Sequence, residues 1–259
     1  MTGGRGFGVA AGLGPAVAAP LARRCEALGY DSLWSNDHPG ADGLETVAVF
    51  GEAAPQVELG VTIALDRHSP DDLRRKIDAL GLERERLTLG IGSGHDRHPV
   101  STMRHALPVL RERLPGVRLV LAAMGPRMCA LGGAEYDGVF VNWMTPGFAA
   151  GAREHVERGA REAGRPSPPV FGYVRAAVGA DAAERLSKEE GLYRGLHRGY
   201  RNHFARLKEP VGTVGIAVTD RDEAQRLLAA YDALDVIVVR ALASATVEAM
   251  TALAEAAAQ

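Results

Sequence analysis

The sequence predicts an α/β protein and, within that class, a TIM (β/α)8 barrel that takes up residues 1–259 as a single domain. The length fits, because barrels of this kind typically need about 250 residues. Short apolar runs bounded by turn residues alternate with helical stretches, and no linker, repeat or low-complexity segment interrupts them. Most runs are apolar on both faces, as expected for parallel strands covered by helices outside and packed inside. A doubly wound open sheet is the alternative.

Eight runs have the length and composition of strands. They cover residues 6–11, 31–35, 58–63, 87–92, 117–123, 138–143, 170–178 and 236–241. In a barrel made of these strands, functional side chains are expected at the carboxyl ends of the strands and in the loops that follow them.

The first helical stretch follows the first expected strand and has a clear buried face. Val17, Leu21, Cys25 and Leu28 lie on this face at four- and three-residue spacing, and Gly29 ends the helix.

The helix after the third expected strand carries both start and stop residues. Ser69 is the expected N-cap, Pro70 has the dihedral preset for the first position, and Asp72 favours the positive end of the helix dipole. Gly81 ends this helix. Its buried face consists of Leu73, Ile77 and Leu80.

Thr145, followed by Pro146, and Ser244 mark the starts of two later helices. Between the last two expected strands lie 57 residues, more than one crossover needs. We therefore expect an extra helical excursion around residues 180–210, over the carboxyl-terminal mouth of the barrel.

The charge balance bears on the kind of partner. Thirty Lys and Arg against 32 Asp and Glu give a net charge of -2, too balanced for an electrostatic nucleic-acid binder or a polybasic membrane clamp. We therefore expect a small-molecule substrate and neither a nucleic-acid nor a membrane partner. Cys25 and Cys129 form no CxxC motif, and no targeting or membrane-spanning segment is expected. These features favour a reducing, cytoplasmic location.

The loop after the second expected strand has four consecutive polar residues, Ser-Asn-Asp-His at 35–38, before the chain turns. Its histidine, His38, can donate a proton or hydrogen-bond an electron-rich ring, since the unperturbed pKa of histidine lies near 6.5. The plain alternative is a capping loop with a solvated histidine.

Two further loops offer small residues and backbone donors. Residues 90–94 (Gly-Ile-Gly-Ser-Gly) let a ligand approach the backbone and present the hydroxyl of Ser93. Residues 124–128 include Pro126, which begins a helix whose free N–H groups point toward any bound anion, with Arg127 alongside. The alternative for residues 90–94 is a simple tight turn. The alternative for residues 124–128 is an ordinary turn with a surface arginine.

Other kinds of site lack their motifs. His95, Asp96 and His98 do not have the spacing of a zinc site, so we expect no metal. The nucleophile elbow, the P-loop and the Rossmann fingerprint are absent from the sequence, and the three lysines lie away from the expected strand ends, which argues against a Schiff-base aldolase.

Three stretches resemble the bacterial-luciferase-like superfamily of flavin- and deazaflavin-dependent oxidoreductases. They are ARRCEALGYDSLWSNDHPG (22–40), RLTLGIGSG (86–94) and LAAMGPRMCALGGAEYDGVFVNWMTP (121–146), and the third is the most specific. Their order on the second, fourth, fifth and sixth strands matches the family. The resemblance covers most of residues 6–178 and, more weakly, VIVVRAL near the end.

The resemblance implies a luciferase-like TIM barrel that holds FMN or the deazaflavin coenzyme F-420 at its mouth, with the phosphate near the fourth and fifth strands. In deazaflavin-dependent relatives an Asp-His pair lies over the ring, which corresponds to Asp37 and His38 as catalytic residues here. A non-prolyl cis peptide bond is implied at Thr62–Ile63. The implied cofactor-binding residues are Thr62, Ile63, Gly92, Ser93, Gly94, Ala123, Met124, Gly125, Pro126 and Arg127.

The sequence also departs from the family. Only about 24 residues (93–116) separate the fourth and fifth strands, where many members carry a long lid. We therefore expect a more open site.

The leading interpretation is an oxidoreductase that transfers hydride between F-420 and a small organic substrate, while His38 supplies or stabilises a proton and the cofactor carries the hard chemistry. A sequence rich in Arg, Ala and Gly, typical of a high-GC genome, favours F-420 over FMN. One alternative is an FMN-dependent monooxygenase, and another is a non-catalytic cofactor-binding homologue whose short lid does not exclude water. The resemblance and the helix residues Val17, Ala18 and Leu21 favour a homodimer.

Overall fold

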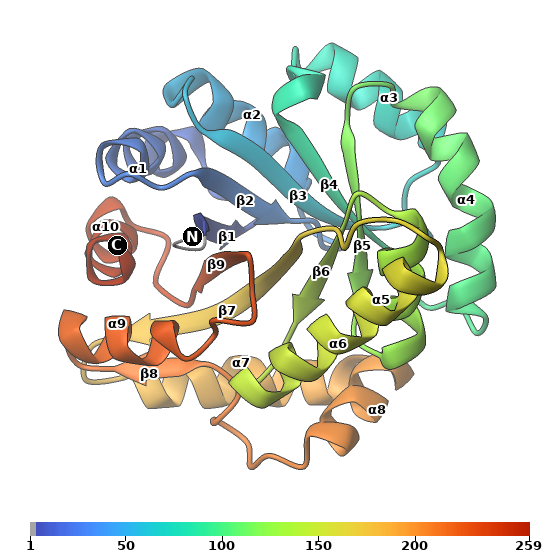
Figure 1. Ribbon diagram of the computed structural model, residues 1–259. Helices are drawn as coiled ribbons and strands as arrows, with labels where there is room; N and C mark the ends of the chain where they lie inside the picture. The colour runs from blue at the N-terminus through green and yellow to red at the C-terminus, as the bar shows by residue number, and fades with distance from the viewer. Residues whose placement is uncertain (1–3) are drawn as a thin grey trace.

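The apolar runs pair side by side, all in parallel, into a closed barrel. In the computed structural model, which describes residues 4–259, each strand of the barrel contacts the next in the order β1-β2-β3-β4-β5-β6-β7-β9, and β9 returns to β1 (Figure 1). The strands are β1 (Gly4–Ala10), β2 (Ser32–Asn36), β3 (Glu58–Ala64), β4 (Leu87–Gly92), β5 (Arg118–Ala123), β6 (Gly138–Asn142), β7 (Val170–Val178) and β9 (Val236–Ala241). The predicted TIM barrel is confirmed.

A ninth strand within residues 4–259 was not predicted. β8 (Ile216–Val218) pairs only with the last residues of β7, on the edge of β7 that β6 occupies lower down and beyond Tyr173, where the pairing with β6 ends. The run is three residues long, which is too short for a pattern-based prediction.

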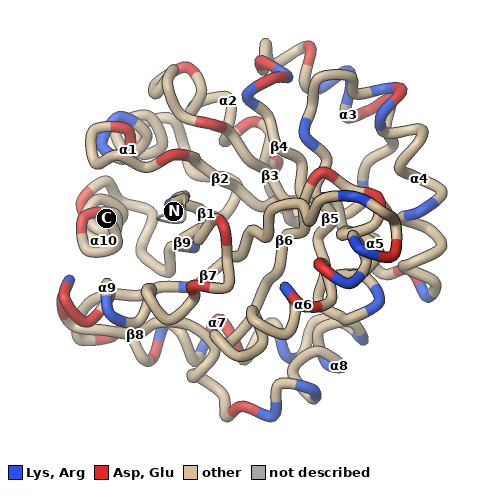
Figure 2. The backbone as a smooth tube through the Cα atoms, viewed as in Figure 1, with Lys and Arg blue, Asp and Glu red and all other residues tan. Residues whose placement is uncertain are grey.

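Helices surround the barrel (Figure 1). They are α1 (Pro15–Ala27), α2 (Gly43–Ala53), α3 (Pro70–Ala79), α4 (Pro99–Arg113), α5 (Pro126–Glu135), α6 (Pro146–Glu162), α7 (Ala182–Leu196), α8 (Arg198–Leu207), α9 (Arg221–Ala229) and α10 (Val247–Ala257), with the short 3-10 turn η1 (Arg84–Arg86) before β4. The expected excursion is confirmed as α7 and α8. Both signs of charge are interspersed around this ring of helices (Figure 2).

Two of the three predicted N-cap residues, Ser69 and Thr145, cap their helices, and the third, Ser244, does not. The hydroxyl of Ser69 accepts a hydrogen bond from the amide of Asp72 at 3.1 Å, and the hydroxyl of Thr145 accepts one from the amide of Phe148 at 3.3 Å. The last helix begins two residues later than predicted, because Thr246 and not Ser244 provides the hydroxyl that caps it.

The barrel interior is filled by a separate cluster of large side chains. It consists of Trp34, Val120, Phe140, Phe171, Tyr173 and Val238. Trp34 fits because β3 carries Gly60 opposite it: a Cβ on Gly60 would lie 2.2 Å from the indole ring. A second and larger apolar layer lies between strands and helices, so the barrel is solid below its mouth.

The surface proposed for dimer formation is largely internal. Ala18 and Leu21 are fully buried within the chain, and of the three residues only Val17 is partly exposed, so the expectation that they form a contact surface was wrong. The homodimer itself stays a prediction. Within the described chain, no helix combines the length and the apolar composition required to cross a bilayer.

Candidate active site at the barrel mouth

A cavity of about 210 Å³ lies at the carboxyl ends of β2 to β7, where residues of the α7–α8 segment form part of its wall. This is smaller than the roughly 300–1,000 Å³ of a typical ligand pocket, so it encloses only part of a large ligand. Its lining consists of Asn36, Asp37, Thr62, Ile63, Ala64, Gly92, Ser93, Gly94, Ala122, Ala123, Met124, Phe140, Asn142, Tyr173, Arg175, Tyr193, His197 and Tyr200.

The structure brings most of the predicted site residues to this cavity. Those that line it are Asp37, Thr62, Ile63, Gly92, Ser93, Gly94, Ala123 and Met124. Gly125, Pro126 and Arg127 line a neighbouring surface recess instead, and His38 is not among the residues that line either hollow.

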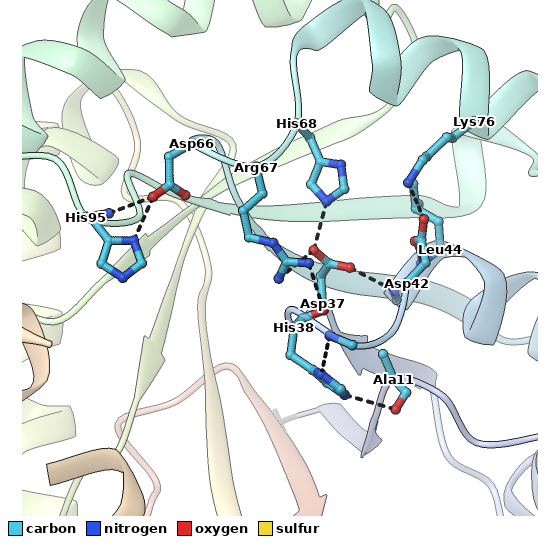
Figure 3. Close-up of polar contacts among 12 residues, drawn as sticks. Ala11, Asp37, His38, Asp42, Leu44, Asp66, Arg67, His68, Lys76 and His95 are labelled. Carbon is cyan, nitrogen blue, oxygen red and sulfur yellow. Dashed lines mark hydrogen bonds and ion pairs between the residues drawn. The ribbon is translucent and has the colours of Figure 1, made fainter. Parts of the chain in front are cut away.

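Asp37 follows β2 and is held by several partners (Figure 3). Its side chain is 1% exposed, pairs with Nη1 of Arg67 at 3.1 Å and lies 2.8 Å from Nε2 of His68. Its Oδ1 accepts a hydrogen bond from the amide of Gly43 at 3.2 Å. The contact with Gly43 holds Asp37 at the start of α2. Because Arg67 compensates the charge of Asp37, this carboxylate adds no free negative charge to the cavity.

His38 is engaged by its own loop (Figure 3). The amide of Gly40 donates to Nδ1 at 3.2 Å, so Nδ1 is an acceptor, and Nε2 carries the proton toward the carbonyl of Ala11 at 3.3 Å. Both ring nitrogens therefore have backbone partners. A catalytic role for His38 stays a prediction.

The cis peptide bond implied at Thr62–Ile63 is absent, so this prediction was wrong. All peptide bonds within residues 4–259 are trans, including Thr62–Ile63. Thr62 pairs with Asn36 on one side and Gly90 on the other, and Ile63 pairs with Ile91, so β3 stays regular through this point. The regular ladder on both sides leaves no bulge at which the implied cis bond would sit.

Two arginines that were not predicted as site residues lie at the floor of the mouth. Arg175 and Arg240 occupy paired positions on β7 and β9 and are 3% and 4% exposed. Nη1 of Arg175 donates to Oδ1 of Asn142, and Nε of Arg240 donates to Oδ1 of Asn36 at 2.9 Å. Burial, and next the positive charge of Arg175, lowers the pKa of Arg240. The signal was available, because each arginine interrupts an apolar strand run.

The α7–α8 segment contributes three further residues that sequence reasoning did not assign to the site, Tyr193, His197 and Tyr200. The amide of Gly199 donates to Nδ1 of His197 at 3.1 Å, which leaves the proton of a neutral ring on Nε2. Burial, and next the nearby ring of His95, lowers the pKa of His197. His197 is therefore a neutral imidazole in the cavity wall.

The recess next to the cavity has a volume of about 350 Å³ and the features of an anion site. It is lined by the first residues of α4 and α5, together with the side chains of Arg97 and Arg127. Free amides at two helix N-termini and two guanidinium groups favour a phosphate-like group. Met124 lines the cavity and Gly125 lines the recess, so the two hollows are neighbours.

The histidines after β4 have partners of their own. Nδ1 of His95 lies 2.8 Å from Oδ2 of Asp66, and Asp96 accepts hydrogen bonds from the amide of His98 and the hydroxyl of Thr102 (Figure 3 shows the His95 pair). Among the residues from 4 onward, no group of three or more His, Cys, Asp or Glu side chains is placed to hold a metal ion.

Comparisons with known proteins find one matching family and several solved structures of similar fold. A family model described as luciferase-like monooxygenase matches residues 101–258. No curated protein matches the chain. Among solved structures, an F-420-dependent secondary alcohol dehydrogenase is 17% identical with a TM-score of 0.78, and each chain is covered over 100% of its length.

Two other structures are also similar in fold. The F-420-dependent tetrahydromethanopterin reductase from Methanopyrus kandleri is 15% identical with a TM-score of 0.76, and 98% of each chain is covered. An EDTA monooxygenase from Chelativorans sp. BNC1 is 13% identical with a TM-score of 0.66, over 95% of this chain and 85% of the other.

Proposed function

Because the chain belongs to the luciferase-like monooxygenase family, we propose that it is an oxidoreductase that uses coenzyme F-420 to transfer hydride to or from a small organic substrate. The observation that best supports this proposal is that two hollows lie next to each other: a cavity in the barrel mouth and a recess at two helix N-termini. This arrangement suits a long cofactor with a ring at one end and a phosphate farther along.

The choice of F-420 over FMN is supported by the comparisons. The two F-420-dependent enzymes match this chain at TM-scores of 0.78 and 0.76, whereas the EDTA monooxygenase matches at 0.66. We take this as support for the cofactor class and for hydride transfer as the reaction.

The residues present fit a flat ring in the cavity. A Cβ on Gly92 would meet only Ala122 Cβ at 3.5 Å and the carbonyl of Ile63 at 3.8 Å, so the fold itself does not require glycine there. The absence of a side chain at position 92 leaves space beside the backbone for a ligand. Thr62 and Ser93 add hydroxyl groups at the same rim.

When bound, F-420 supplies the carbon that gives or accepts hydride. The chain's part is to orient the ring with β3, β4 and β5, to hold the phosphate at Arg97, Arg127 and the N-termini of α4 and α5, and to hold a proton at Nε2 of His197. Tyr193 and Tyr200 narrow the mouth and reduce access of water to the reacting carbon.

A side-by-side titration of the purified protein with F-420 and FMN tests this proposal. We expect saturable binding of F-420, weaker binding of FMN, and at least tenfold weaker F-420 binding by Gly92→Val, which fills the cavity. Thermal unfolding of the unliganded variant is the control for its fold. Preferential binding of FMN would favour an oxygen-dependent monooxygenase, and binding of neither compound would refute the proposal.

A further inference from the structure

The floor of the mouth holds two positive charges that the protein does not neutralise. Within residues 4–259, neither Arg175 nor Arg240 forms an ion pair with a carboxylate, although both are almost fully buried. A buried charge without a counter-charge is costly unless something else solvates it. This imbalance calls for an explanation in terms of a ligand.

Arg175 is held in place without being saturated. Its guanidinium carbon lies 3.7 Å from the ring centroid of Trp143 and 4.9 Å from that of Tyr193, and these aromatic faces stabilise a cation. Trp143, the ring that stacks on Arg175, adopts a φ of +50°, a strained backbone conformation for a bulky residue. The Nε of Arg175 has no hydrogen-bond partner among the described residues.

The two asparagines at the floor are oriented by the arginines. An arginine only donates hydrogen bonds, so the amide oxygens of Asn36 and Asn142 must face Arg240 and Arg175, respectively. Their NH2 groups remain as donors, and that of Asn142 lies 3.5 Å from the hydroxyl of Tyr200. Both asparagines and Arg175 line the cavity, so all three offer N–H donors to its floor.

The acidic groups nearby do not cancel this positive field. Asp37 lines the cavity, but it is paired with Arg67. Glu189 on α7 acts on Arg240 only through a longer-range electrostatic attraction, without an ion pair. A floor with an uncompensated positive charge and amide N–H donors, beneath an open cavity, is complementary to an anion.

We propose that Arg175, with the amide groups of Asn36 and Asn142, forms a subsite for a small oxyanion, and that the organic substrate carries a carboxylate that binds there. The planar fork of a guanidinium matches the two oxygens of a carboxylate. The assignment of this anion to the substrate rests on the proposed function, since the recess at α4 and α5 takes the phosphate of the cofactor. The anion subsite itself does not rest on it.

Formate is a probe small enough for the floor of the cavity. Isothermal titration of the cofactor-free protein with sodium formate, at constant ionic strength, is expected to show saturable binding. Arg175→Gln should weaken this binding at least tenfold, and Arg175→Lys should restore part of it. Arg118→Gln, which removes an exposed arginine at the amino end of β5, is the matched control and should bind formate as the wild type does.

Asn142→Asp separates binding from folding. The substitution keeps the shape of the side chain but places a carboxylate against Arg175, so the protein fills its own anion site. We expect the melting temperature to rise while formate binding is lost. A merely structural Arg175 would give no formate binding to lose, and saturable formate binding that persists in both Arg175→Gln and Asn142→Asp would overturn the proposal.

Titrating the same proteins with F-420 and FMN distinguishes the two proposals. Unchanged cofactor affinity in Arg175→Gln, together with lost formate binding, supports a substrate carboxylate at this position. If the wild type binds no formate and Arg175→Gln loses cofactor affinity, the arginine contacts the cofactor ring and the substrate assignment is wrong. If the wild type binds formate but neither cofactor, the proposed function fails and the anion subsite stands.

Discussion

At the scale of single residues, two histidines, His38 and His197, are candidates for the proton donor. The sequence assigns the role to His38, but its ring nitrogens face the backbone of residues 11 and 40, whereas His197 forms part of the cavity wall. We expect His197→Ala to lower single-turnover hydride transfer by about 10²–10⁴-fold, the usual range for acid–base groups. His38→Ala should lower stability with a much smaller effect on the rate. A larger loss of the single-turnover rate in His38→Ala than in His197→Ala would identify His38 as the proton donor.

Arg127 tests the position of the phosphate. It is exposed in the recess at the start of α5, where an anion would meet both its charge and the free amides. Arg127→Ala removes a charge-assisted contact worth roughly 1.5–3 kcal/mol, so F-420 affinity should fall about ten- to a hundred-fold. Arg104→Ala, on the outer surface of α4, is the control. Equal affinity of the Arg127 and Arg104 variants would make Arg127 an ordinary surface residue.

At the scale of elements, the contact between α5 and α6 depends on glycine. A Cβ on Gly159 would lie 2.0 Å from the carbonyl oxygen of Ala130, and one on Gly133 would lie 2.0 Å from that of Val156. Because backbone atoms would have to move, we expect Gly159→Ala to destabilise the protein by roughly 1–3 kcal/mol in urea unfolding. Gly151→Ala, on the same helix with open space around it, should be neutral or stabilising by up to about 1 kcal/mol.

The docking of α8 is expected to depend on pH. His203 is fully buried, and its Nε2 donates to the carbonyl of Trp143 at 2.5 Å. Burial lowers its pKa below the ordinary value despite backbone hydrogen bonds that oppose the shift. Below about pH 6.5 the unfolded chain therefore binds more protons at this site than the folded one, and stability falls as the pH is lowered.

Urea unfolding at pH 7.5 and pH 5.5 measures this effect. The loss of stability between the two values should be smaller in His203→Gln than in the wild type. His105→Gln removes an exposed histidine from α4 and should keep the wild-type dependence. An identical pH dependence in all three proteins would show that His203 does not contribute.

At the scale of the whole molecule, the barrel and the α7–α8 segment are expected to unfold together. Trp34 belongs to the cluster inside the barrel, and Trp143, the residue after β6, belongs to the cluster that packs α7 and α8 against the end of β7. In a single domain, fluorescence from either tryptophan and far-UV circular dichroism should give the same urea midpoint. Trp143→Phe leaves Trp34 as the reporter. If wild-type fluorescence, to which both tryptophans contribute, gave a lower urea midpoint than dichroism while the fluorescence and dichroism midpoints of Trp143→Phe agreed, the segment would unfold on its own.

Much of the fold could be predicted because strands and helices leave periodic patterns in the sequence. The eight barrel strands, the excursion after β7 and the caps at Ser69 and Thr145 follow from apolar runs and capping side chains. β8 could not be predicted, because three residues carry no pattern and its pairing depends on the end of β7 that β6 leaves unpaired. The start of α10 was displaced by two residues, since either of two hydroxyls can cap a helix and only the chain path selects Thr246.

The sequence by itself determined the barrel and the rim at which the site lies, because short-range apolar patterns specify strands and helices and a parallel barrel presents its strand ends on one face. Only the tertiary structure decided which side chains meet there. Arg175 and Arg240 lie 65 residues apart but share one register position across β7 and β9, and the α7–α8 segment brings His197 to the mouth. Register and chain path are long-range properties, so the sequence marks each arginine as unusual within its strand but does not show which side chains meet.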